Sequence, residues 1–293
     1  MFKKVLVPID FSRYSQKVLE CVGEIPGLTE IVLLHVVARG PLMRFWDPVA
    51  EVRDAERKLA EETRRIKLPN VGVKTRATFA VGGAGDVVGS TINKIADEEN
   101  ADLIIMGARG RSLIGSDILG SSSRGVLRYG DRNLLIMRYK LLGDMEKGSL
   151  EKYCARIFSR VLVPTDLSEP SEAATSLIKN ISGIGEIILL YVVSRGETKG
   201  EIDTATTSAT EKLNEIASAW KQGNVAVTPK AVVGNAIEEI RRVADELDVS
   251  LIAMSSQGAT ALKTGRIGST AYDVANSSDR PVLILRPGRT ISS

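Results

Sequence analysis

Short apolar runs alternate with longer segments of helical periodicity along the whole chain. In the first half these runs are rich in Val, Ile and Leu and are apolar on both faces, which is typical of strands buried in a parallel sheet. The predicted strands are VLVPI, EIVLLHVV, VKTRATFAV, ADLIIMG and NLLIMR. The predicted helices between them cover about 13–25, 48–67, 86–99 and 121–130. This order predicts an α/β fold, a doubly wound five-stranded parallel sheet with helices on both faces.

The second half of the chain repeats the first, in the same order. The paired blocks are 3–12 with 159–168, 31–40 with 187–196, 95–110 with 243–258 and 133–138 with 281–286. A shared order and register over four blocks indicates a tandem duplication rather than a chance likeness of apolar runs. We therefore predict two domains, 1–140 and 157–293. The charged segment 141–156 is predicted to be an irregular linker with at most a short helix.

Composition excludes several classes of function. The net charge is +3 and basic residues are interspersed with acidic ones, while aromatic residues make up only 4%, so nucleic acid is not an expected partner. No apolar run approaches the roughly 18 residues of a membrane helix, and the N-terminus lacks a signal peptide, so we expect a cytoplasmic protein without membrane contact. His35 is the only histidine and lies in an apolar run, where a packed core residue is expected rather than a catalyst.

The segment MGARGRSLIGSDILGSSSRG, residues 106–125, follows the fourth predicted strand and precedes a helix. Backbone N–H groups at a helix start favour phosphate, glycines allow close approach of an anion, and serines add donors. Arg109, Arg111 and Arg124 add positive charge nearby. A phosphate cradle is one interpretation, and a flexible loop with a capping serine is the other. The chain contains no GxxxxGK[ST] motif, so it is not a P-loop NTPase.

Gly107, Gly110, Gly120 and Ser121 have the spacing G-x2-G-x9-G-[ST], which resembles the nucleotide-binding signature of the universal stress protein family. The resemblance covers nearly the whole chain as two consecutive domains. Its further motifs are VPID and VPTD, LLHV and LLYV, AVG and VVG, IIMGARG and IAMSSQG, and LLIM and VLIL. The fold that this resemblance implies is similar to that of the adenine nucleotide alpha hydrolases.

The resemblance also implies that the first domain binds ATP or AMP, with or without Mg²⁺, at the strand ends. The residues expected against adenine and ribose are Pro8, Ile9, Asp10, Val36 and Gly107. The residues expected to donate to phosphate are Gly110, Gly120, Ser121 and Ser122. A carboxylate suits ribose hydroxyls, and N–H groups suit phosphate. The alternative role of Asp10 is to cap the first helix together with Ser12.

The second copy departs from the signature, because Ser255 replaces the first glycine. We expect the serine to crowd the ribose, and the position to need a positive φ. Gln257 and Ala259 also replace two arginines of the first loop. The expected weaker second site consists of Asp166, Val192, Gly258, Gly268, Ser269 and Thr270. The first domain is therefore predicted to bind nucleotide, and the second to bind it weakly or not at all.

These features favour a nucleotide-binding switch in a stress response over an enzyme, because no general base can be identified in the sequence. Slow ATP hydrolysis, with Asp10 and Asp117 as metal contacts, and a scaffold without ligand are the alternatives. Family members dimerise through the edge strand, so the resemblance implies that 133–138 pairs with 281–286 as an intrachain pseudo-dimer. Further association into a homodimer is a second expectation.

Overall fold

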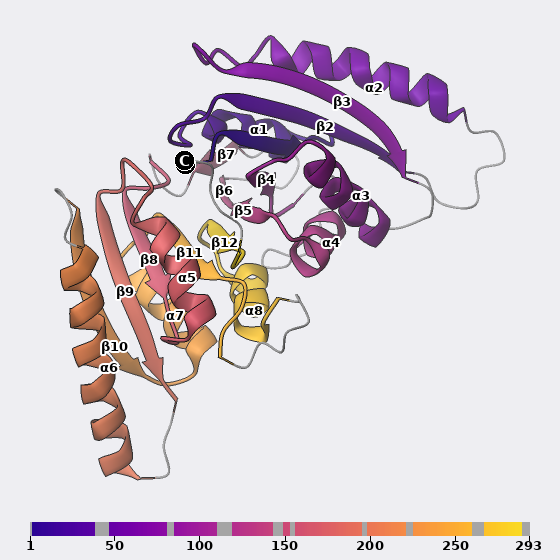
Figure 1. Ribbon diagram of the computed structural model, residues 1–293. Coiled ribbons are helices and arrows are strands. Elements are labelled where there is room, and N and C mark those ends of the chain that lie inside the picture. The colour runs from indigo at the N-terminus through magenta and orange to yellow at the C-terminus, as the bar shows by residue number, and fades with distance from the viewer. Residues whose placement is uncertain are drawn as a thin grey trace. The chain divides into compact units, whose positions relative to one another are not determined.

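A computed structural model describes residues 2–38, 47–80, 85–109, 119–142, 149–152, 156–194, 198–220, 225–259 and 267–288. The chain divides into two compact units, and the division along the sequence falls between Glu151 and Lys152 (Figure 1). Gly110, Arg111, Asp117 and Cys154 lie outside the described residues. The predicted limits of the linker, 141–156, stay a prediction.

The first unit contains a parallel sheet in the order β5-β4-β1-β2-β3. Its strands are β1 (Lys4–Pro8), β2 (Glu30–Ala38), β3 (Gly72–Ala80), β4 (Leu103–Gly107) and β5 (Asn133–Met137). Its helices are α1 (Arg13–Val22), α2 (Pro48–Thr63), α3 (Gly85–Glu98) and α4 (Ser121–Tyr129). The strand order reverses between β1 and β4, and because crossovers are right-handed this reversal puts α1 and α2 on one face and α3 and α4 on the other. The predicted doubly wound α/β fold is confirmed.

The second unit repeats this topology, with the order β10-β9-β8-β11-β12. Its strands are β8 (Arg160–Pro164), β9 (Glu186–Val193), β10 (Ala226–Val233), β11 (Leu251–Ser255) and β12 (Val282–Leu285). Its helices are α5 (Glu169–Ile178), α6 (Lys199–Trp220), α7 (Ala236–Glu246) and α8 (Ser269–Ser277). The register between the first two strands is also the same in both units. Lys4 of β1 is paired with Glu30 of β2, and Arg160 of β8 is paired with Glu186 of β9.

The segment between the fifth strand of the first unit and the start of β8 differs from its prediction. It contains β6 (Tyr139–Leu142) and β7 (Ser149–Lys152), which form a two-stranded sheet, where the sequence predicted an irregular linker with at most a short helix. Leu150 is buried, and the Tyr139 hydroxyl lies 3.5 Å from Cys21 Sγ of α1. The contact of Tyr139 with Cys21, distant in the sequence, is one that the charged composition of the segment did not indicate.

The helix pair on one face of each sheet packs differently in the two units. In the first unit α3 and α4 meet at two glycines, because a Cβ added to Gly89 would lie 2.7 Å from Gly125 Cα. Such a distance leaves no room for any side chain. In the second unit the corresponding residue of α7 is Ile237, so α7 and α8 cannot approach in the same way.

Candidate functional site

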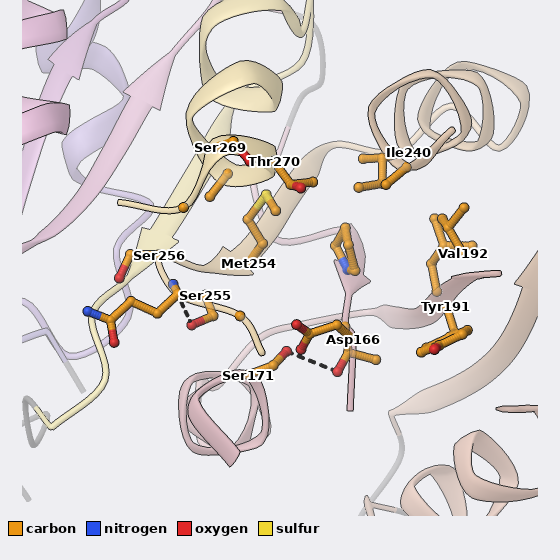
Figure 2. A pocket seen from close by; sticks show the side chains of 18 residues that line it. Asp166, Ser171, Tyr191, Val192, Ile240, Met254, Ser255, Ser256, Ser269 and Thr270 are labelled. Carbon is orange, nitrogen blue, oxygen red and sulfur yellow. Dashed lines mark hydrogen bonds between the residues drawn. The ribbon is translucent and has the colours of Figure 1, made fainter. Parts of the chain in front are cut away.

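A cavity of about 180 Å³ lies at the carboxyl edge of the second sheet, where the strand order reverses between β8 and β11 (Figure 2). This edge is where open α/β sheets bind ligands. The six residues predicted for the second site all line the cavity: Asp166, Val192, Gly258, Gly268, Ser269 and Thr270. The structure therefore brings together residues that are up to about a hundred positions apart in the chain.

The cavity has an apolar wall and a polar rim. Figure 2 shows Tyr191, Val192 and Ile240 on one side, with Met254 between them and the start of α8. Asp166 lines the cavity from the turn after β8, near Ser171 of α5. An apolar wall with a few polar groups is typical of small-molecule sites. The motif analysis missed Tyr191, Ile240 and Met254, although the apolar periodicity of their elements placed them on buried faces.

Asp166 is tied to two segments of the chain. Its Oδ1 accepts hydrogen bonds from the Ser168 backbone N–H at 3.1 Å and from the Ser168 hydroxyl at 2.6 Å. Its Oδ2 accepts from the Ala259 backbone N–H at 2.7 Å. In the first unit Asp10 Oδ1 likewise accepts from the Ser12 N–H, at 3.0 Å. Both aspartates thus order the turn before the first helix of their unit, which is the alternative role considered for Asp10.

Ser255 lines the cavity, so the expectation that it crowds a ligand stays a prediction. Its hydroxyl donates to the Pro170 carbonyl at 3.2 Å and accepts from the Gln257 N–H at 3.1 Å, so it is used inside the protein (Figure 2). Gly107, its counterpart, is not among the described glycines with a positive φ. A Cβ added to Gly107 would meet the Arg109 carbonyl oxygen at 3.0 Å and Val18 at 3.7 Å. The expectation that this position needs a positive φ is therefore wrong.

The helices that follow the glycine loops start without a side-chain cap. α4 begins after Gly120 and α8 after Gly268, and neither N-cap residue offers a side-chain acceptor. By contrast, Ser12, Asp47 and Asn235 cap α1, α2 and α7 with their side chains. The first N–H groups of a helix have no intrahelical partner. At α4 and α8 these groups are therefore left for water or for an anionic ligand.

The residues predicted for the first site lie at the equivalent edge of the first unit, with Gly110 outside the described part. Pro8 ends β1, and the Ile9 N–H continues the ladder with a 2.7 Å bond to the Leu34 carbonyl. The others follow the same edge: Asp10 after β1, Val36 in β2, Gly107 at the end of β4, and Gly120, Ser121 and Ser122 at the start of α4.

His35 is only half-buried, so the prediction of a packed core residue holds only in part. Its Nδ1 lies 2.5 Å from the Ile9 carbonyl oxygen, and its ring packs on Phe11 with centroids 4.5 Å apart. By the internal repeat His35 corresponds to Tyr191, which lines the second cavity.

Within the described ranges no three His, Cys, Asp or Glu side chains are grouped as a metal site would require. Asp10 and Asp166 lie in different units, and each is held in hydrogen bonds to backbone N–H groups. Asp117, which the sequence offers with Asp10 as a metal contact, lies outside the described residues, so that expectation stays a prediction. In the same described ranges no helix is long and apolar enough to span a membrane.

Two doubly wound units of the same topology, each with a helix start without a side-chain cap near the strand-order reversal, define a tandem α/β protein. The chain belongs to the universal stress protein family, whose model matches residues 1–138 and 158–286.

Individual relatives agree with this assignment. A universal stress protein structure from Archaeoglobus fulgidus matches with a TM-score of 0.70 and 28% identity, over 97% of this chain and 96% of that one. Universal stress protein MJ0577 of Methanocaldococcus jannaschii is 28% identical over 161 residues, 48% of this chain and 97% of its own length. A universal stress protein of Mycolicibacterium smegmatis is 23% identical over 302 residues, 97% of each chain. The likeness to full-length relatives shows that the tandem arrangement recurs.

Proposed function

We propose that this protein binds an adenine nucleotide, ATP or AMP, at the carboxyl edges of its sheets and acts as a regulatory switch in a cytoplasmic stress response. The observation that carries the proposal is the cavity of the second unit, because all six residues expected there from the signature line it. The adenine nucleotide is the ligand implied by the signature, and the stress-response role rests on the family.

The chemistry of the cavity matches the parts of such a ligand. The side chains of Tyr191, Val192 and Ile240 offer an apolar wall for a base. The Asp166 carboxylate offers acceptors to ribose hydroxyls, and the uncapped start of α8 offers N–H donors to a phosphate. Binding requires all three because a nucleotide is apolar at one end and anionic at the other.

We further propose that the first domain is the stronger site. Arg109 follows β4 there, and Arg124 lies in the first turn of α4, where both add positive charge near a phosphate. Gln257 and Tyr272 take these positions in the second domain. Among the described residues that line the second cavity, only Asp166 is charged. A polyanionic ligand therefore gains more at the first domain.

Binding, rather than turnover, is the proposed activity. Hydrolysis requires an oriented water and, as a rule, metal-held phosphates, and no general base can be identified in the sequence. Slow hydrolysis and a scaffold without ligand are the alternatives. We retain the intrachain pseudo-dimer through 133–138 and 281–286, and a homodimer, as proposals.

Chromatography of the nucleotide released from the purified, denatured protein tests the proposal. We expect adenine nucleotide in substoichiometric to equimolar amount. Gly120→Val, which places a branched side chain at the start of α4, should abolish its retention, whereas the matched Gly268→Val should leave most of it. Absence of nucleotide, together with no uptake after incubation with ATP or AMP, would favour the scaffold.

A further inference from the structure

The carboxylate of Asp166 joins two loops that lie 93 residues apart in the sequence. One oxygen holds the turn before α5 through Ser168, and the other holds the Ala259 N–H of the glycine loop at 2.7 Å. A hydrogen bond to an ionised acceptor is stronger than one between neutral groups. The bond therefore fixes the part of the glycine loop that immediately follows Gly258.

The Asp166 carboxylate also lies close against Gly258. A Cβ added at this position would lie 2.4 Å from Asp166 Oδ2, which is closer than real side chains allow. The φ of Gly258 is not in the left-handed region, so its backbone does not itself require glycine. The signature glycine thus makes room for an aspartate of the same domain.

Gly268 provides a matched contrast within the same signature. Of the described residues, a Cβ added there would meet the Ser256 carbonyl oxygen, at 3.6 Å, which is an ordinary contact. An alanine at 258 would therefore require the Asp166 carboxylate to shift, whereas the described neighbours of 268 would not have to move for one. The two glycines of one motif therefore differ in how much space their surroundings leave for a side chain.

We propose that Asp166 is the positioning residue of the glycine loop in the second domain, in addition to its expected contact with ribose. By holding the Ala259 N–H it fixes the start of the loop, at Gly258 and Ala259, beside the cavity, so that ribose and phosphate binding are coupled through one carboxylate. The part of this proposal that concerns ligands rests on the proposed function, whereas the positioning of the loop does not.

The loop is tested without ligand by amide hydrogen exchange of the full chain. Asp166→Ala should speed exchange of the Ala259 amide about tenfold or more, because its acceptor is removed. Ser168→Ala is the matched control: it removes one donor to Oδ1, keeps the bond to Ala259, and should leave that rate unchanged. An unchanged Ala259 rate in Asp166→Ala would overturn the proposal.

A double-mutant cycle tests the reason for the glycine. Gly258→Ala should speed exchange at Ala259 on its own, but should add nothing in the Asp166→Ala background, where the clash is gone. Gly268→Ala should have no effect on this amide in either background. Equal effects of Gly258→Ala in both backgrounds would show that the carboxylate does not dictate the glycine.

The coupling of ribose and phosphate binding is tested by the preference for AMP over adenosine. The direction in which Asp166→Ala changes this preference distinguishes an effect of loop positioning from an effect of charge. With the first site blocked by Gly120→Val, the affinities for AMP and adenosine give the contribution of the phosphate. Removing a negative charge near an anion should raise that contribution by Coulomb's law alone. Loss of loop positioning should lower it, so we expect the preference for AMP over adenosine to fall about threefold or more in Asp166→Ala.

A rise in this preference would overturn the coupling of ribose and phosphate. If neither ligand binds the parent chain, the proposed function fails for this domain, and the exchange experiments still decide whether Asp166 positions the loop.

Discussion

The two domains keep the same ligand edge but different helix packing. The Gly120 N–H donates to the carbonyl of Ala108, which directly follows β4, at 2.8 Å. The Gly268 N–H donates in the same way to the carbonyl of Ser256, which directly follows β11, also at 2.8 Å. Phe11 and Leu167, one residue after the two aspartates, have φ of 60° and 59°. On the same face of the sheets, however, Gly89 of α3 corresponds to Ile237 of α7. The comparison teaches that the backbone at this edge is kept although several of its side chains change, whereas the contact between the helices has diverged.

Exchanging the residues at the helix contact should give the largest effect. Gly89→Ile would push α3 off α4, because a single Cβ already meets the Gly125 backbone at 2.7 Å. We expect a loss of about 3 kcal/mol in the free energy of unfolding of the first domain. Urea denaturation monitored by circular dichroism, with the exposed Ser90→Ala as control, measures it. A loss below about 1 kcal/mol would show that the two glycines are not in tight contact.

Exchanging the first residue of the signature should have a moderate effect on stability. Ser255→Gly removes hydrogen bonds to Pro170 and Gln257, so we expect a loss of about 1–2 kcal/mol in the free energy of unfolding. Nucleotide affinity of the second domain should not change, because the hydroxyl is used inside the protein. A gain in affinity, measured by titration with AMP in the Gly120→Val background, would support the view that the serine crowds the ligand.

The strands and helices of both domains were predictable because each has its own period of apolar residues. The residues of the cavity were predictable where the signature names them, as with Gly258 and Thr270. The hydrogen bonds between side chains and backbone groups of distant segments could not be predicted. Ser255 bonds to a carbonyl 85 residues away, and Asp166 bonds to an amide 93 residues away. Such partners depend on the packed fold rather than on local sequence.

The amino-terminal edges of the two sheets carry ion pairs, and we expect the smallest difference between the domains in how these pairs respond to pH. Lys4 lies 3.1 Å from both Glu30 and Glu99, with side chains 19%, 29% and 21% exposed. A hydrogen bond from Lys74 chiefly lowers the pKa of Glu30, against the effect of burial and with help from Lys4. A hydrogen bond from Lys4 is the main cause that lowers the pKa of Glu99.

Because these pKa values are lower in the folded state, the stabilisation is complete above the ordinary value of 4.5 and is lost as pH falls through the lowered values. Lys4→Met should lose about 1 kcal/mol at pH 7, and its stability should converge with that of the parent as pH falls through the lowered pKa values. In the second domain the corresponding pair, Arg160 and Glu186, is more exposed, so Arg160→Met should cost less. Urea unfolding at several pH values measures both. A constant difference at all pH values would contradict the ionic origin.

The most direct test of nucleotide binding by unequal domains is calorimetric titration of ATP with Mg²⁺ into the nucleotide-free full chain, followed by chromatography of the recovered ligand. We predict a stoichiometry near one, intact ATP, loss of the heat in Gly120→Val and its retention in Gly268→Val. Two sites of equal affinity would contradict the asymmetry between the domains, and the absence of heat with ATP and with AMP would contradict nucleotide binding itself.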